Sequence, residues 1–249
     1  MSPHAVLPAV ALALALGLPA AALAGTWIGG DGDDRLSGTI EADQIYGEAG
    51  NDRLAGAAGW DYLEGGPGDD DISGGTGVDL AIGGTGDDRI DGGAGADAVY
   101  AGAGADLTLG GAGGDTLYGQ VGTDQIFGGS GADLIYASLG GDFVDAGSGS
   151  DRVTSEQDDV TILGGPGADL VVAGGGRVEV SGGAGRDRIR TGSDDDIVSG
   201  GGAPDSIEAG AGDDVIRARD GRRDRIDCGD GDDTAIADSF DLLSGCEAR

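Results

Sequence analysis

The chain repeats with a period of nine residues. Written in blocks of nine from Gly29 to Arg217, the sequence has an Asp at the sixth position of 19 of its 21 blocks. An aliphatic residue occupies the eighth position with similar regularity, and Gly is frequent at positions one, two and four. A fixed short period is typical of solenoids, in which each repeat packs only against its neighbours. The repeat therefore predicts a stack of short coils rather than a globule with a single central core.

The sixth-position Asp residues divide into two series when two blocks form one coil. The odd blocks contain Asp34, Asp52, Asp70, Asp88, Asp106, Asp124, Asp142, Asp196 and Asp214, with Val160 and Val178 interrupting the series. The even blocks contain Asp43, Asp61, Asp79, Asp97, Asp115, Asp133, Asp151, Asp169, Asp187 and Asp205 without interruption.

The residue types within a block favour binding of a hard cation. Glycines at positions one, two and four allow positive φ and tight turns, which bring carbonyl oxygens together, and the Asp adds a carboxylate. Oxygen ligands gathered in this way suit Ca²⁺. The three residues after the Asp are predicted to form a short strand whose middle side chain points inward. The alternative is a solenoid whose Asp residues only cap turns, without metal.

Nine blocks carry the complete G-G-x-G-x-D pattern, among them residues 65–70 and 128–133. This pattern resembles the RTX, or hemolysin-type, calcium-binding nonapeptide repeat. The resemblance implies an all-β fold, a parallel β-roll in the form of a two-sheet right-handed solenoid. It also implies that two blocks form one coil, so that each Asp series stacks along one edge, and that multiple Ca²⁺ ions lie between loops of adjacent coils. Neighbouring Asp pairs set an upper limit of 16 sites, and the glycine-poor loops at 38–42 and 137–139 are expected to bind Ca²⁺ poorly or not at all.

The charge balance narrows the possible functions. With 46 acidic residues against 14 basic ones the net charge is −32, which disfavours nucleic acid and anionic membranes as partners and favours cations. All 14 basic residues are Arg, and the one His lies at position 4, so lysine chemistry and catalytic His sites are excluded from the repeats. We expect no enzymatic activity. Because the acidic chain repels itself, folding is expected to depend on Ca²⁺.

Both ends of the chain differ from the repeats. Residues 1–24 are predicted to be a signal peptide cleaved after Ala22-Leu23-Ala24, the alternative being an uncleaved membrane anchor. Cleavage leaves no membrane span and a secreted, extracellular or cell-surface protein, bacterial by its composition. Residues 25–217 form the predicted β-roll, with Trp27 placed to cover its first coil. Residues 218–249 are predicted to be irregular repeats and a C-terminal cap, joined by a Cys228–Cys246 disulfide; two free thiols are the alternative.

One outward-facing column of the predicted sheet is apolar and aromatic. Ile82, Tyr100, Tyr118 and Tyr136 follow one another at intervals of 18 residues. This strip either contacts a cell-surface, polysaccharide or self-association partner, or only steadies the sheet by cross-strand packing. Arg152, Arg188 and Arg190 lie farther along the same face and are interpreted as solvated charges, the alternative being an anion site.

These features together predict a secreted calcium-binding protein with a structural, surface or adhesive role. The alternative is a calcium-dependent extracellular enzyme with its active site on the solenoid surface.

Overall fold

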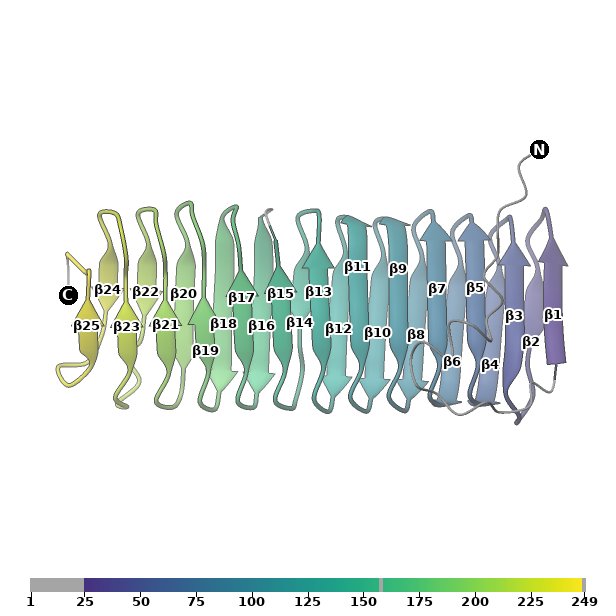
Figure 1. The fold of residues 1–249 in the computed structure, drawn as a ribbon, viewed down its shortest axis with the longest axis horizontal. Coiled ribbons are helices and arrows are strands. Elements are labelled where there is room, and N and C mark those ends of the chain that lie inside the picture. Colours follow the sequence, from purple (N-terminus) through teal and green to yellow (C-terminus); the bar gives the residue numbers. More distant parts are fainter. Residues whose placement is uncertain (1–24, 157–158, 248–249) are drawn as a thin grey trace.

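The computed structural model describes residues 25–156 and 159–247, which form an elongated roll of two facing β-sheets (Figure 1). The chain alternates between the sheets, so that each coil contributes one strand to each sheet. All pairings within the sheets are parallel. The predicted all-β parallel two-sheet solenoid is therefore confirmed.

The strands of the described residues fall into a 13-stranded and a 12-stranded sheet. The 13-stranded sheet contains β1 (Gly25–Gly30), β3 (Asp43–Glu48), β5 (Tyr62–Pro67), β7 (Leu80–Thr85), β9 (Ala98–Gly104), β11 (Thr116–Gly122), β13 (Leu134–Ser138), β15 (Arg152–Ser155), β17 (Leu170–Ala173), β19 (Arg188–Arg190), β21 (Ser206–Glu208), β23 (Arg225–Asp227) and β25 (Leu242–Ser244). The 12-stranded sheet contains β2 (Arg35–Ser37), β4 (Arg53–Gly59), β6 (Asp71–Gly77), β8 (Arg89–Ala94), β10 (Leu107–Ala112), β12 (Gln125–Ser130), β14 (Phe143–Asp145), β16 (Val160–Pro166), β18 (Val178–Ala184), β20 (Ile197–Gly201), β22 (Val215–Arg217) and β24 (Thr234–Ile236).

The register follows the nine-residue period. Partner residues on neighbouring strands are 18 positions apart, as in Ala81 beside Val99 and Leu54 beside Ile72. These eighth-position side chains point between the sheets and are buried, while their neighbours on each strand face outward. The core is consequently one side chain thick, and Ala81 and Thr108 occupy the same inward positions as the larger aliphatic residues.

The glycines of each loop serve two different purposes. Glycines at positions two and four have positive φ, as in Gly66 (110°) and Gly68 (140°), a conformation that favours glycine. The prediction that position one also needs positive φ is wrong, because Gly65 and its equivalents do not have it. Position one is restricted by space, since a Cβ on Gly65 would lie 2.1 Å from Oδ2 of Asp70.

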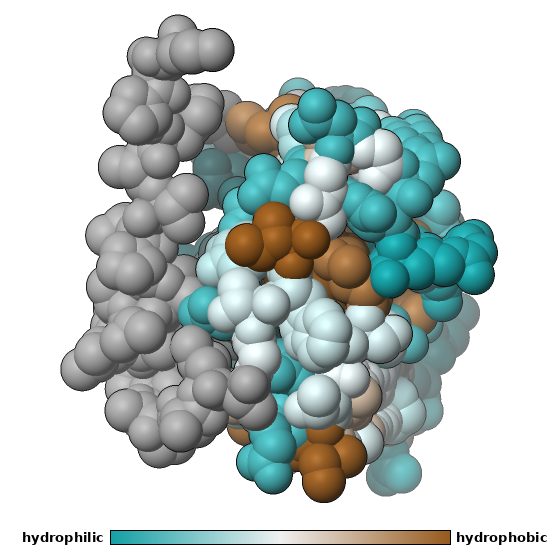
Figure 2. Space-filling view, turned by 90° about the vertical axis from the view of Figure 1, so that its right-hand side faces the viewer, coloured by the Kyte–Doolittle hydropathy of each residue, from teal (hydrophilic) through white to brown (hydrophobic). Residues whose placement is uncertain are grey.

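The first coil leaves apolar side chains at the β1 end of the roll (Figure 2). Trp27 lies in register with Ile45, the inward position predicted for it, and remains 39% exposed because no described coil packs against its other side. Ile28 and Ile40 are also exposed in this region. The predicted signal peptide, residues 1–24, lies outside the described residues. Within the described part of the chain, no helix has the length and apolarity that crossing a membrane requires.

The C-terminal segment continues the stacking with altered spacing. Ser206 pairs with Arg225 after 19 residues, and Arg225 pairs with Leu242 after 17. The predicted disulfide is confirmed, with Cys228 and Cys246 joined across a Cα–Cα distance of 5.3 Å. Cys228 occupies position one of its block and is fully buried, so the disulfide fastens the last described strand, β25, to the core.

Candidate metal-binding edges

The sixth-position Asp residues form two hydrogen-bonded ladders, one on each edge of the roll. In both ladders the backbone N–H of one Asp donates to Oδ1 of the Asp in the next coil, as from Asp70 to Asp88 at 2.8 Å and from Asp79 to Asp97 at 2.8 Å. We name them the Asp34 ladder and the Asp43 ladder after their first members. At most steps the carboxylate is fixed by one oxygen, and its other oxygen is left to point into the loop; in Asp34 and Asp43, Oδ2 instead accepts the N–H of Gly30 and of Thr39.

The second carboxylate oxygen is buried without a hydrogen-bond partner at most steps. Oδ2 is in this state in Asp52, Asp61, Asp70, Asp79, Asp88, Asp97, Asp106, Asp115, Asp124, Asp133, Asp151, Asp169, Asp187, Asp196, Asp205, Asp214 and Asp233, and Oδ1 is in Asp43. A buried carboxylate oxygen without a donor is strongly unfavourable. Such repetition indicates that a positive ligand completes these groups.

Where position one is glycine, its backbone shapes the space beside the orphaned oxygen; Ala101 and Ala146 occupy the same position ahead of Asp106 and Asp151. A Cβ placed on Gly83 would lie 2.4 Å from Oδ2 of Asp88 and 2.3 Å from the carbonyl oxygen of Ala101, one coil further on. Gly74 shows the same pair on the other edge, with Asp79 Oδ2 at 2.7 Å and the Gly92 carbonyl at 2.6 Å. The carboxylate and the carbonyl therefore flank a space that a methyl group would fill.

The donor set is one of hard oxygens. No three acidic, His or Cys side chains gather at one point in the part of the chain that the structure describes. A cation in these loops would therefore take a carboxylate oxygen from the ladder and further oxygens from backbone carbonyls, a set that suits Ca²⁺. Bound Ca²⁺ would supply positive charge beside the buried carboxylates. The carboxylate and carbonyl oxygens of these loops therefore fit Ca²⁺ as a ligand set.

Burial raises the pKa of the ladder carboxyls. The pKa of Asp88 rises from 3.8 to about 7, chiefly through loss of solvation, and repulsion from Asp106 and Asp70 adds to the rise although the Asp70 N–H opposes it. The pKa of Asp79 on the other edge likewise rises to about 7, for the same leading cause. Without a cation, keeping the ladder carboxyls ionised in the folded chain therefore costs free energy of solvation.

The interruption of the Asp34 ladder is packed with apolar side chains. Val160 and Val178 are buried in register with one another between the two parts of the ladder. The N–H of Val178 still donates to Oδ1 of Asp196 at 2.8 Å, so the second part of the ladder begins on a valine. These two steps offer no side-chain oxygen to a cation.

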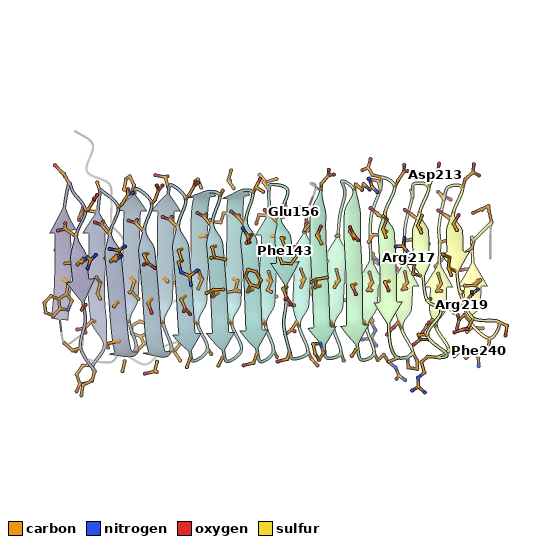
Figure 3. All side chains as sticks on the ribbon, turned by 180° about the vertical axis from the view of Figure 1, so that it is seen from behind. Phe143, Glu156, Asp213, Arg217, Arg219 and Phe240 are labelled. Atoms are coloured by element: carbon orange, nitrogen blue, oxygen red, sulfur yellow. A yellow bond between two sulfur atoms is a disulfide. The ribbon has the colours of Figure 1, made fainter. Side chains whose placement is uncertain are left out.

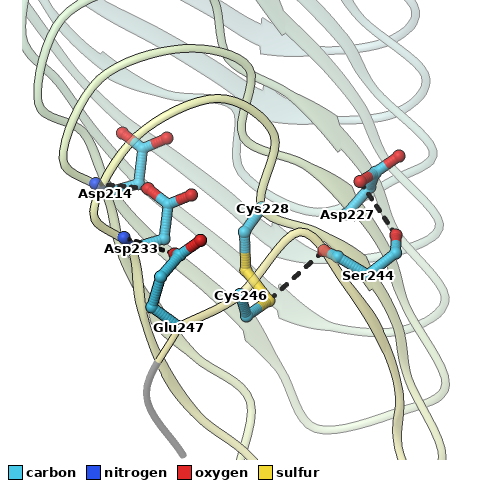
Figure 4. Close-up of a disulfide and its surroundings, with 7 residues drawn as sticks. All are labelled: Asp214, Asp227, Cys228, Asp233, Ser244, Cys246 and Glu247. Carbon is cyan, nitrogen blue, oxygen red and sulfur yellow. Dashed lines mark hydrogen bonds between the residues drawn. A yellow bond between two sulfur atoms is a disulfide. The ribbon is translucent and has the colours of Figure 1, made fainter.

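Both ladders extend into the C-terminal segment, which the sequence reasoning did not anticipate. On the Asp34 ladder, Asp214 donates to Asp233 at 2.9 Å and Asp233 donates to Oε2 of Glu247 at 2.8 Å (Figure 4). The Asp43 ladder continues from Asp205 to Asp224 at 2.9 Å and on to Asp241 at 3.0 Å. The changed spacing of 19, 17 and 14 residues conceals these members from a nine-residue count.

A second, exposed ladder runs along the Asp34 edge at position five, and it was also missed. There the N–H of each residue donates to the previous coil, as from Asn51 to Asp33 at 3.0 Å and from Asp87 to Asp69 at 2.9 Å. The hydrogen bonds of the buried and exposed ladders thus run in opposite directions. The sequence pattern could have revealed this ladder, because an Asp or Asn recurs every 18 residues at positions 33, 51, 69 and 87.

The outward faces of the described residues carry three aromatic groups, one of which is the tilted pair of Tyr46 and Tyr62, with ring centroids 5.4 Å apart on the 13-stranded sheet. Tyr100, Tyr118 and Tyr136 stack as predicted, with ring centroids 4.6 and 4.7 Å apart and interplanar angles of 7° and 3°. On the 12-stranded sheet, Phe127 and Phe143 lie 5.8 Å apart in a tilted arrangement that the sequence reasoning did not identify. Figure 3 shows Phe143 and Arg217 on this second face and Asp213 at the Asp34 edge.

Comparison with known families agrees with this geometry. No protein with a curated description matches the chain. A model of the RTX calcium-binding nonapeptide repeat matches residues 28–61, 54–81, 73–108, 109–144, 145–178, 179–205 and 199–235, which together span most of the sequence. The chain belongs to the family of RTX calcium-binding nonapeptide-repeat proteins.

Proposed function

We propose that this protein is a secreted structural or surface protein whose β-roll folds when Ca²⁺ enters the two Asp ladders. The observation that carries the proposal is the repeated, buried and unpartnered carboxylate oxygen. An ion that binds only the folded chain stabilises that state by mass action, so Ca²⁺ couples binding to folding. The disulfide between Cys228 and Cys246 supports an oxidising, extracellular setting.

A calcium titration tests the folding switch. Far-UV circular dichroism of the full chain, with its disulfide formed, is followed from chelator into millimolar Ca²⁺, with Mg²⁺ as the matched control. We expect a cooperative transition from coil to β structure in Ca²⁺ and little change in Mg²⁺. A β spectrum that chelator leaves unchanged would overturn the proposal, because the roll would then hold its carboxylates without metal.

We also propose that the roll acts without catalysis. The described loops repeat one arrangement of carboxylate and carbonyl oxygens many times rather than concentrating different groups at one place. Screens for hydrolase activity with and without Ca²⁺ check this directly. Calcium-dependent turnover that survives purification would favour the alternative, an extracellular enzyme with its active site on the solenoid surface.

A further inference from the structure

One outer surface of the roll contains no acidic side chain apart from the buried ladder. On the 13-stranded sheet the outward residues from Leu80 on β7 to Arg190 on β19 include no Asp or Glu. In the adjoining loops of the Asp43 edge, between residues 74 and 187, the ladder Asp residues are the only acids. We name this surface the acid-free face. By contrast, the 12-stranded sheet presents Asp71, Asp91, Asp145 and Glu179.

Two arginines on this face have no acidic partner. Arg152 and Arg188 are exposed, and neither forms an ion pair with any carboxylate of the described residues. Arg190 pairs with Glu208, beyond the end of the face. A shallow pocket of about 260 Å³ lies at this end of the face, lined by Leu170, Arg188 and Arg190 and bounded on its far side by Glu208. In a chain with 46 acidic residues, a face that keeps acids away from exposed arginines complements an anionic partner.

The tyrosine stack offers hydroxyl groups and ring edges rather than ring faces. Because Tyr118 is sandwiched between Tyr100 and Tyr136, both of its faces are covered. The exposed ring edges carry the positive part of the aromatic quadrupole, and the row carries phenol hydroxyls, of which that of Tyr118 hydrogen-bonds to Tyr100. Such a row suits a ligand rich in oxygen acceptors along its length.

The spacing of the charges selects a polymer with sparse charge. Arg152 and Arg188 lie on β15 and β19, two coils apart in the sheet, which is about 10 Å and close to the length of two linked pyranose rings. From Tyr100 to Arg190 the face extends five coils, about 24 Å. A densely charged polyanion would be repelled by the chain as a whole, whereas a polysaccharide with one carboxylate per two sugars meets an arginine at matching intervals.

We propose that the acid-free face binds an acidic polysaccharide along the axis of the roll, with Arg152 and Arg188 contacting carboxylates and the tyrosine hydroxyls contacting sugar oxygens. This role replaces the interpretation of the arginines as solvated charges. It rests on the proposed function, because the face exists only when the coils are stacked.

Binding to immobilised hyaluronan, in which carboxylated and neutral sugars alternate, tests the proposal. The full chain is measured in Ca²⁺ by biolayer interferometry, with dextran as neutral probe and polyphosphate as dense polyanion. We expect binding to hyaluronan only. Arg152→Ser with Arg188→Ser is expected to weaken binding at least about tenfold, and Tyr118→Phe about threefold. The matched control, Arg35→Ser with Arg89→Ser on the opposite face, makes the same charge change and should leave binding within about twofold.

Circular dichroism of each variant separates the two proposals. A chain that folds in Ca²⁺ but does not bind hyaluronan, binds dextran equally well, or keeps its affinity in the Arg152 and Arg188 double variant overturns the polysaccharide proposal alone. A calcium-dependent dimer in light scattering that Tyr118→Ser abolishes would also overturn it, because a second copy would then cover the face. A chain whose β spectrum is independent of Ca²⁺ overturns the proposed function instead.

Discussion

Replacing Asp88 by Asn should stabilise the metal-free roll and destabilise the calcium-bound one. Asp88 is 2% exposed, and its Oδ1 accepts the N–H of Asp70 at 2.8 Å while its Oδ2 has no partner in the described structure. Asparagine keeps the Oδ1 acceptor. It replaces the second oxygen with an NH₂ group that can donate to the neighbouring carbonyl of Ala101, which flanks the same space.

The size of the effect follows from the cost of the buried charge. Loss of solvation is the main reason that the pKa of Asp88 rises from 3.8 to about 7. At pH 8 this rise corresponds to at most about 4 kcal/mol against the ionised form, and relaxation with water entry reduces it to about 2 kcal/mol. The metal-free fold should gain about 2 kcal/mol on substitution. In Ca²⁺ the substitution leaves a buried ion without one charged partner, which should cost about 4 kcal/mol of binding. Because this loss exceeds the gain in the metal-free fold, the calcium-bound roll should be destabilised by about 2 kcal/mol net.

Two midpoints measured by circular dichroism at pH 8 check this reversal of sign. One is the midpoint of folding induced by trimethylamine N-oxide in chelator, and the other is the midpoint of urea unfolding in Ca²⁺. Asp87→Asn is the matched control, since Asp87 is exposed and its Oδ1 accepts the N–H of Ala105 at 2.8 Å. It should move neither free energy by more than about 0.5 kcal/mol. If Asp88→Asn destabilises both states, or Asp87→Asn has the same effect, the reasoning from the orphaned oxygen is refuted.

Three further predictions concern pH, the glycine-lined space and the disulfide. Burial raises the pKa of Asp79 and Asp124 from 3.8 to about 7, so the metal-free fold should lose stability as pH rises from about 4 through 7. Ca²⁺ binding near pH 6 should then release protons, which calorimetry in buffers of different ionisation enthalpy measures. Absence of proton release would contradict this prediction. Gly65→Ala places a methyl 2.1 Å from Oδ2 of Asp70 and should weaken Ca²⁺ binding at that step in a calcium titration, with the roll still folded because Ala101 and Ala146 occupy the same position in other coils; Gly32→Ala, where a Cβ meets open space, should not. Cys246→Ser should lower the free energy of unfolding by about 3 kcal/mol in thermal melts and expose β25 to hydrogen exchange; unchanged protection there would argue against the disulfide's anchoring role.

The nine-residue pattern was sufficient to predict the coils, the sheets and their register. A period shared by the buried Leu54 and Ile72 and by the ladder members Asp52 and Asp70 leaves one way to stack the blocks, and the structure has it. The stacking of the tyrosines was predicted from the same spacing of 18 residues. Prediction succeeded here because each repeat meets only its neighbours, so local spacing determines distant contacts.

What the pattern did not reveal depends on atomic geometry or on departures from the period. Composition cannot distinguish a glycine needed for positive φ, such as Gly66, from one needed for space, such as Gly65. Glu247 joins the Asp34 ladder only because the disulfide and a shortened coil bring it beside Asp233. The pairing of Phe127 with Phe143 was missed because the two are diagonal neighbours rather than register partners.

The direction of the buried ladders makes the two ends of the roll chemically different. In every ladder step an earlier coil supplies the N–H and a later coil supplies the carboxylate, as from Asp70 to Asp88. At the amino end, Asp34 and Asp43 therefore accept no N–H from an earlier coil of the described residues, and their Oδ2 atoms accept the N–H groups of Gly30 and Thr39 from their own loops. At the carboxyl end each ladder finishes on an acceptor, Glu247 or Asp241, that takes up the last N–H. The roll thus has a polarity along its axis that the repeated coils alone do not reveal.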